Sequence, residues 1–276
     1  MLELDDDRKA ALARTLEESA RVLASVRYGT AFAFGAGYVV LNPDDPVAAG
    51  SFASGLDAPD LGTVERTLLA LPLVWAEAGR RSVVVLASPS SAPELDLLAE
   101  ECGYEAAEEL STMLLTEPRQ LVDGEPGIRV RPLPERDEHR VGALVAAAHG
   151  WSPGVARRLQ VVQGHRLDDP RHVAFGAWDG EELVGVATGF LHGATGQVVE
   201  VCVDVAHRRR RLGRALASAV ATTLLARGAR LVWLTAEQGG LVERCFTGLG
   251  FEAAYDAVLF TCPVDGGSGG PECGSG

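Results

Sequence analysis

The chain has 276 residues, of which 47% are hydrophobic and 23% charged, with a formal net charge of −13. This profile is typical of a folded globular protein and excludes a disordered chain, a collagen and a coiled coil. Because no apolar run reaches the about 18 residues of a membrane helix, and residues 1–7 are acidic where a signal peptide is basic, we expect a cytoplasmic protein without a membrane partner.

The first half alternates helical and extended patterns of hydrophobic residues. An acidic first turn begins a helix over 5–26, and two apolar runs around Gly35-Ala36 predict a hairpin. The predicted elements are helix 5–26, strands 30–34 and 37–41, helix 63–78, strand 82–87, helix 92–102 and strand 104–115. This order predicts an α/β unit.

The second half has a similar pattern, with a hairpin signal at Asp179-Gly180 between two apolar runs. The predicted elements are strand 127–133, helices 137–148 and 151–163, strands 172–178, 182–191 and 197–205, helix 212–227, strand 231–235, helix 240–249 and strand 251–260. The two halves also end alike, because G-Y-E-A-A at 103–107 recurs as G-F-E-A-A at 250–254 after a similar strand and helix. We interpret this as an internal repeat, giving two tandem α/β (α+β) units with mixed sheets flanked by helices.

Charge and composition set the predicted domain boundaries. Residues 1–126 hold 22 acidic and nine basic residues, whereas 127–276 hold 16 of each. Proline, glycine and acidic residues gather before Gly127 and predict a linker, and the glycine-rich end predicts a flexible tail. The predicted parts are a domain over 1–118, a linker over 119–126, a domain over 127–262 and a tail over 263–276.

Cysteine and histidine spacing gives no indication of a metal site. The five cysteines are scattered without a C-x-x-C pair, and the six histidines form neither H-E-x-x-H nor H-x-H. We therefore predict reduced thiols and no metal.

One segment carries a chemical signal, V-E-V-C-V-D-V-A-H-R-R-R-R-L-G-R-A-L-A over 199–217. A valine-rich strand leads through a basic turn into a helix that begins near Gly213. The first N–H groups of a helix lack intrahelical partners and carry partial positive charge, so they suit phosphate oxygens. The alternatives for the arginine run are a solvated basic turn or a nucleic-acid patch, and the net acidity of the chain argues against the second.

This segment resembles the pyrophosphate signature [QR]-x-x-G-x-[GA] of the GNAT superfamily of acyl-CoA-dependent N-acyltransferases. Arg208 stands at its first position and Gly213 at its last, while Arg211 replaces the first glycine. The element order and Leu249-Gly250-Phe251 also follow the family, so the resemblance covers about residues 127–262. The first half has an acidic approach to its helix at 57–62, which would repel phosphate. We interpret residues 1–118 as a degenerate GNAT-like domain without cofactor, with an unrelated α/β domain as the alternative.

The resemblance implies acetyl-CoA as co-substrate, with its pantetheine arm between splayed strands and its pyrophosphate on the loop. The implied cofactor-binding residues are Val201, Cys202, Val203, Arg208, Arg209, Arg210, Arg211, Leu212, Gly213, Arg214, Ala215 and Phe246. It places a small-molecule amine acceptor near His149, Trp151 and His192.

Acetyl transfer to an amine needs a base, for which we select Glu200 on the valine-rich strand, with Glu237 as second choice. The alternative for Glu200 is a surface or arginine-paired carboxylate. Many family members use a tyrosine acid in the last helix, and Phe246 occupies that position here. Cys245 and Tyr255 are the substitutes that the sequence offers for this acid. The predicted activity is therefore direct transfer of acetyl from acetyl-CoA to a primary amine. The alternative is a non-catalytic acyl-CoA-binding or interaction module, and the oligomeric state stays open, with a homodimer as one option.

Overall fold

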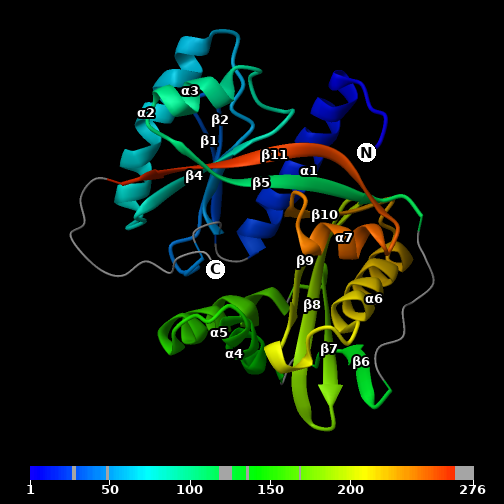
Figure 1. Ribbon diagram of the computed structural model, residues 1–276. Helices are drawn as coiled ribbons and strands as arrows, with labels where there is room; N and C mark the ends of the chain where they lie inside the picture. The colour runs from blue at the N-terminus through cyan, green and yellow to red at the C-terminus, as the bar shows by residue number, and fades with distance from the viewer. Residues whose placement is uncertain (27–28, 48–49, 118–125, 135–136, 168, 265–276) are drawn as a thin grey trace. The chain divides into compact units, whose positions relative to one another are not determined.

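The computed structural model describes residues 1–26, 29–47, 50–117, 126–134, 137–167 and 169–264 (Figure 1). Most of the predicted linker 119–126 and of the predicted tail 263–276 lies outside these residues. The described chain forms two compact units. Unit 1 comprises Met1–Met113, Thr235–Glu243 and the described residues from 253 onward, and unit 2 comprises Leu114–Leu234 and Arg244–Glu252.

Unit 1 is a helix-covered sheet with the strand order β1-β2-β3-β4-β11-β5. Its elements are α1 (Asp6–Val26), β1 (Thr30–Phe34), β2 (Gly37–Leu41), β3 (Phe52–Ser54), α2 (Leu61–Glu77), β4 (Ser82–Ala87), α3 (Leu95–Glu101), and most of β5 (Glu105–Leu115) and β11 (Phe251–Pro263). Helix α2 turns Val64, Leu68, Leu71 and Trp75 into the core, at the three- and four-residue spacing of an amphipathic helix.

The last strand of the chain lies mostly in unit 1. Strand β11 pairs antiparallel with β4, from Val258↔Ala87 to Pro263↔Ser82, and lies between β4 and β5 in the sheet. The compact units therefore divide the chain differently from the sequence halves, because most of β11 follows unit 2 in sequence but completes the sheet of unit 1.

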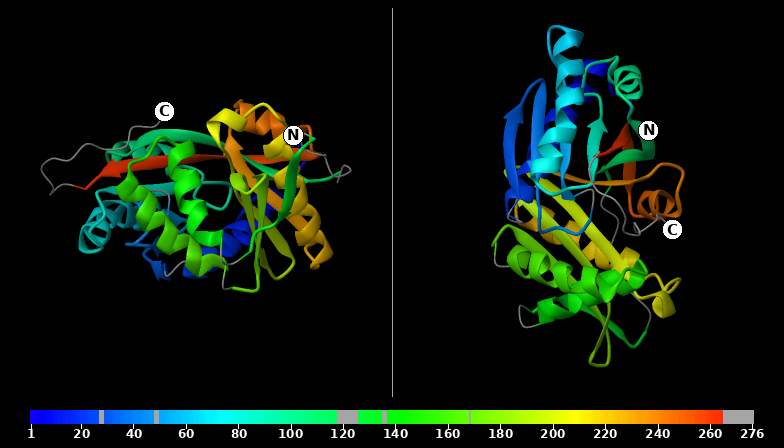
Figure 2. Two further views of the ribbon diagram at one scale, coloured as in Figure 1. Left: turned by 90° about the horizontal axis from the view of Figure 1, so that it is seen from below. Right: turned by 90° about the vertical axis from the view of Figure 1, so that its left-hand side faces the viewer.

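Unit 2 has the strand order β10-β9-β8-β7-β6, antiparallel except for the β9–β10 pair. Its elements are β6 (Ile128–Pro132), α4 (Glu138–Ala148), α5 (Pro153–Leu167), β7 (His172–Asp179), β8 (Glu182–His192), β9 (Thr195–Val203), the short turn η3 (Val205–His207), α6 (Leu212–Ala226), and parts of β10 (Leu231–Glu237) and α7 (Leu241–Thr247). Helices α4 and α5 cover one face of β7–β9, and α6 covers the other (Figures 1 and 2). The predicted α/β class with mixed sheets and flanking helices is confirmed, and the three-residue β3 is the strand that the sequence patterns missed.

The Leu249-Gly250-Phe251 motif has a backbone explanation within unit 2. Gly250 has φ +94°, and a Cβ at this position would collide with the carbonyl oxygen of Glu117. The N–H of Thr116 also donates to the Gly250 carbonyl at 3.1 Å. Glycine at position 250 therefore lets the chain approach the Thr116–Glu117 segment closely, which a side chain would prevent.

No helix in the described ranges is both long and apolar enough to cross a membrane.

Candidate functional site

The parallel strands β9 and β10 part within unit 2 and leave an open strand edge. Their ladder consists of Leu231↔Thr195, Val232↔Gly196 and Trp233↔Gln197. Strand β9 continues beyond this ladder to Val203, paired with β8 on its other side. Backbone N–H and C=O groups along such an edge can hydrogen-bond an extended ligand in the manner of an added strand.

Beyond β9, the chain is fixed before it enters the arginine loop, Arg208–Arg211. The Asp204 carboxylate accepts a hydrogen bond from the N–H of Ala206. The Nδ1 atom of His207 lies 3.2 Å from Oδ1 of Asp204, and its Nε2 atom lies 3.5 Å from Oδ2 of Asp179. The hydrogen bond from His207 is the main cause of a lowered pKa at Asp204. These contacts tie the start of the loop to the tip of the β7–β8 hairpin.

The arginine loop contains two left-handed residues that are not glycine. Arg209 has φ 65°, and Arg211 has φ 60° and ψ 8°. Arg211 stands where the GNAT signature has its first glycine, so the loop retains a backbone conformation that glycine favours although arginine replaces it. A left-handed conformation costs a residue with a Cβ about 1–2 kcal/mol. Such strain concentrates where a backbone shape serves a function.

We expect opposite results from two substitutions at Arg211. Arg211→Gly should leave the free energy of unfolding unchanged or raise it by up to about 1 kcal/mol, because relief of strain exceeds the added unfolded-state entropy. Arg211→Val should lower it by about 1 kcal/mol or more, since a β-branched residue resists positive φ. Urea unfolding measures both changes. Equal stability of the two variants would show that the left-handed conformation is not maintained in solution.

Helix α6 begins without a capping hydrogen bond from its own N-cap side chain. Arg211 occupies its N-cap position and makes no capping hydrogen bond through its side chain. A Cβ built on Gly213 would lie 3.7 Å from the Val201 side chain and 3.9 Å from that of Val203. The structure thus brings predicted cofactor residues of the open β9 edge and of the α6 N-terminus together. Uncapped N–H groups and the helix dipole make this end an anion site.

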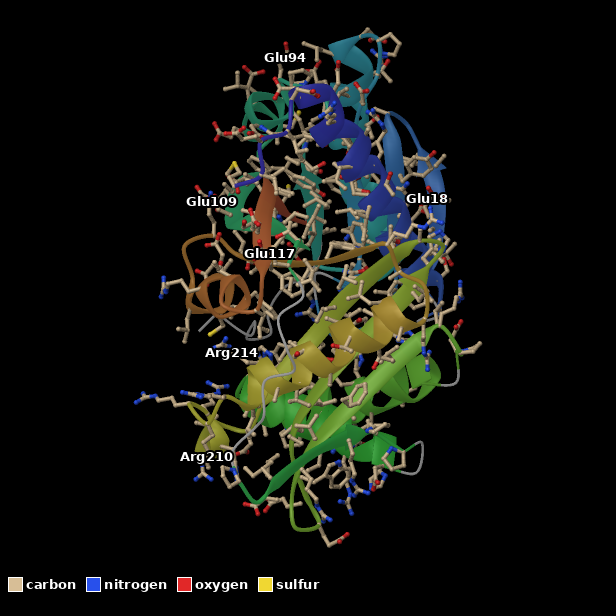
Figure 3. All side chains as sticks on the ribbon, turned by 90° about the vertical axis from the view of Figure 1, so that its right-hand side faces the viewer. Glu18, Glu94, Glu109, Glu117, Arg210 and Arg214 are labelled. Carbon is tan, nitrogen blue, oxygen red and sulfur yellow. The ribbon has the colours of Figure 1, made fainter. Side chains whose placement is uncertain are left out.

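Two arginine side chains of this segment donate hydrogen bonds to backbone carbonyl groups. The Arg208 guanidinium donates to the carbonyl of Ala148 at 2.8 Å and to that of Val203 at 3.3 Å, which links the end of α4 to the end of β9. Arg214 donates to the carbonyl of Gly248 at 2.8 Å. Arg209, Arg210 and Arg211 are exposed on the loop, and Figure 3 labels Arg210 among them. Leu212 and Ala215 are buried in the first turn of α6.

Glu200 projects from β9 toward the face covered by α4. Cβ atoms built on Gly185 and Gly189 of β8 would contact Leu216 and Val220 of α6. Strand alternation therefore turns Thr188 to the opposite face, and its directly paired neighbour Glu200 shares that face. A register shift at this point leaves Val199 as the extra residue of a bulge. The half-buried Glu200 thus lies on the α4 side, whereas Val201 and Val203 lie on the α6 side.

Cys202 is a buried thiol of low reactivity. Burial raises its pKa to about 12, with a further rise from the charge of Glu200 that Arg208 opposes. We expect iodoacetamide at pH 8 to alkylate the exposed Cys245 at least 10-fold faster than Cys202, because the thiolate is the reacting form. Mass spectrometry of the native protein measures both rates, and equal labelling would contradict the burial of Cys202.

The predicted acceptor residues fall into two groups. His149 and Trp151 stack at 4.5 Å between ring centroids, directly after the Ala148 carbonyl that Arg208 holds. His192 pairs with Thr195 at the other end of β9, eight residues from Val203, a span of about 26 Å along an extended strand. The structure therefore places His149 and Trp151 near the Val203 end of β9 and His192 at the opposite end.

Three further candidates lie away from the loop or point into the core. Phe246 is buried and packs edge-on against Phe251, at 5.5 Å between centroids. Glu237 and Tyr255 belong to unit 1, not to unit 2 with Glu200. Burial, and then the charge of Glu237, raises the pKa of Glu108. Burial also raises the pKa of Tyr255, against a hydrogen bond with Thr112 that lowers it.

Sequence reasoning missed two polar residues on the Glu200 face. Thr188 is 2% exposed, and both its Oγ1 and the Oε1 of Gln197 are buried. The signal was present in the sequence, because each is a polar residue inside an apolar strand. Within the part of the chain that the structure describes, no group of three His, Cys, Asp or Glu residues could hold a metal.

The corresponding place in unit 1 is built differently. Strands β3 and β4 are parallel, and beyond their ladder the N–H of Ala92 donates to the carbonyl of Leu56 at 2.9 Å. The N-terminus of α2 is capped by Asp60, whose carboxylate accepts from Thr63 N–H and Oγ1. The side-chain hydrogen bond from Thr63 is the largest cause of a lowered Asp60 pKa. An acidic side chain thus occupies the helix end that in unit 2 is uncapped.

Comparison with known proteins confirms the resemblance. Residues 137–251 match the model of the acetyltransferase (GNAT) family. No curated protein sequence matches the chain. A GCN5-related N-acetyltransferase structure from Kribbella flavida is 21% identical, covering 94% of this chain and 96% of its own, with a TM-score of 0.67.

Two other solved structures are similar over most of the chain. A GCN5-related N-acetyltransferase from Sphaerobacter thermophilus is 22% identical, covering 84% of this chain and 78% of its own, with a TM-score of 0.61. A tandem GNAT protein from the clavulanic acid biosynthesis pathway is 16% identical, covering 84% and 79%, with a TM-score of 0.58. At such identities these likenesses establish the fold.

Proposed function

Because residues 137–251 match the model of the acetyltransferase (GNAT) family, we propose that the protein transfers an acetyl group from acetyl-CoA directly to a primary amine of a small molecule. The observation that carries this proposal is the uncapped N-terminus of α6 beside the open edge of β9. A phosphate ligand and an extended amide-bearing arm match these two features.

Different residues of unit 2 are proposed to bind different parts of acetyl-CoA. The N–H groups that open α6, from Leu212 to Arg214, would hold the pyrophosphate, and the exposed side chains of Arg209 and Arg211 add charge-assisted hydrogen bonds. The backbone of Val201–Val203 would bind the pantetheine arm. Arg208 serves mainly to hold the ends of α4 and β9 together.

The chemistry requires an amine without its extra proton, next to a thioester that acetyl-CoA supplies. Glu200 is the proposed base, because it is half-buried on the α4 face, one residue from the proposed pantetheine backbone. Glu200 takes the extra proton of the ammonium form, the neutral nitrogen then forms a bond to the acetyl carbon, the carbon–sulfur bond breaks, and the nitrogen loses a second proton as the amide forms. Phe246 has no hydroxyl to give the departing sulfur a proton, so we assign that proton to water or to the acceptor.

Unit 1 is proposed to act as a GNAT-like domain without cofactor. The hydrogen bond from Ala92 to Leu56 bridges the segments that follow β3 and β4, and the Asp60 carboxylate already caps α2. Phosphate would have to displace this carboxylate and overcome its charge. This arrangement supports a single cofactor site for each chain.

Release of free thiol tests the proposed activity. The protein is incubated with acetyl-CoA and a panel of amines that includes 1,4-diaminobutane, pentylamine, 2-phenylethylamine and 5-aminopentanoate, and new thiol is followed by a chromogenic disulfide. Amine-dependent thiol release with matching N-acetyl product supports the proposal. Stabilisation by CoA without turnover across the panel would favour the second candidate, a non-catalytic acyl-CoA binder, which the missing hydroxyl at Phe246 suggests.

A further inference from the structure

Three polar side chains share the α4 face of the unit 2 sheet. Thr188 of β8 is paired directly with Glu200 of β9, and Gln197 of β9 is paired with Phe190, two residues along β8 from Thr188. Because directly paired residues point to the same face and alternate residues along a strand do too, all three project toward α4. The surrounding positions are small or apolar, such as Ala174 beside Thr188.

Two of these side chains bury oxygen atoms that nothing in the described chain satisfies. The Thr188 Oγ1 and the Gln197 Oε1 are both buried without a hydrogen-bond partner among the described residues. Thr188 is 2% exposed, so bulk water does not compensate for the lost hydrogen bonds. A buried polar group without a partner is destabilising, and valine would fill the same volume at Thr188 without this cost. Such a hydroxyl beside the proposed base indicates a ligand.

We infer that Thr188 and Gln197 bind the acceptor amine and hold it against Glu200. This inference rests on the proposed acetyl transfer and names the acceptor more closely. Gln197 Oε1 and the Glu200 carboxylate accept hydrogen bonds, and the Thr188 hydroxyl can accept one as well. Diagonal neighbours in a sheet are roughly 7–8 Å apart. The matching acceptor carries a second hydrogen-bond donor a few bonds from the reacting nitrogen, as a diamine or an amino alcohol does.

Kinetics of single variants with two amines of similar length test this inference. The wild type should acetylate 1,4-diaminobutane at least 10-fold more efficiently, in kcat/KM, than pentylamine, which lacks the second donor. Thr188→Val and Gln197→Leu should each remove most of this preference, while the KM for acetyl-CoA stays within twofold. Thr188→Ser keeps the hydroxyl and should restore it.

Thermal unfolding separates a ligand contact from a structural role. Thr188→Val should raise the Tm by about 2 °C, because it removes an unsatisfied buried hydroxyl. The matched control is Thr67→Val in unit 1, where a similarly buried hydroxyl accepts from Ala36 N–H and donates to the Thr63 carbonyl. That variant should lower the Tm and leave the kinetics unchanged.

Each outcome decides the inference. Unchanged kinetics with both amines in Thr188→Val would overturn it and leave the proposed function standing, since the hydroxyl would then hold a structural water only. Equal use of the two amines by the wild type would overturn the second-donor assignment. Failure of the wild type to acetylate any amine of the panel, despite stabilisation by CoA, would remove the proposed function and this inference with it.

Discussion

Replacing Gly213 by glutamate is expected to raise the Kd for CoA at least 100-fold. A side chain at this position starts within 3.7–3.9 Å of Val201 and Val203, so it enters the space between the open β9 edge and the N-terminus of α6. Its carboxylate would bind the same uncapped N–H groups as a phosphate and would repel the pyrophosphate. Negative charge in the first turn of a helix is stabilising, so the variant should fold normally. Calorimetric titration with CoA measures the loss.

The control for this experiment is Gly213→Ala. The added Cβ makes contacts at ordinary van der Waals distance, and Gly213 is not among the residues with positive φ. We expect alanine to keep the Tm within about 2 °C of wild type, because it creates neither strain nor collision, and to retain measurable CoA binding. Wild-type affinity in Gly213→Glu would contradict the placement of the pyrophosphate at α6, and with it the proposed acetyl transfer.

The local pattern of residues predicted most of the helices and strands, but it did not predict which strands pair with each other in the sheet. The Asp179-Gly180 turn and the periodicity of 212–227 each gave an element close to its observed position. The same patterns do not say which strand lies beside which. Strands β5 and β11 begin within closely similar Gly-aromatic-Glu-Ala-Ala segments, so local preference does not determine that β11 lies between β4 and β5. Such pairing is decided by contacts between residues far apart in the sequence.

The candidate site was predictable where a short segment defines it and not where distant segments meet. The strand, arginine run and glycine of 199–217 were sufficient to predict a phosphate site at the start of α6. The link from Arg208 to Ala148 spans 60 residues and depends on tertiary structure. The distance of His192 from Trp151 follows from the length of β9, which only the register reveals. Similarly, the position of the bulge must be known before Thr188 can be paired with Glu200 across β8 and β9.

Replacing Glu200 by glutamine is expected to lower kcat about 100-fold or more, the usual contribution of a general base. Glutamine keeps the size of the side chain and one acceptor oxygen, but it replaces the other oxygen by a donor group and cannot take a proton at neutral pH. Because Glu200 lies on the α4 side of β9 and the N-terminus of α6 lies on the other side, the Kd for CoA should stay within twofold. Rapid-quench measurement of N-acetyl product, with CoA titration in parallel, separates the two quantities.

Two further glutamine variants make this result specific. Glu182→Gln alters an exposed glutamate at the start of β8 and should behave as wild type. Glu237→Gln alters the second candidate base, which lies in unit 1 beside Glu108. A large loss of kcat in Glu237→Gln with full activity in Glu200→Gln would transfer the base to unit 1. We expect the larger loss of kcat in Glu200→Gln. Glu200 adjoins both the open β9 edge and the buried hydroxyl of Thr188. A base takes the proton of the amine when it lies within hydrogen-bond reach, directly or through one water.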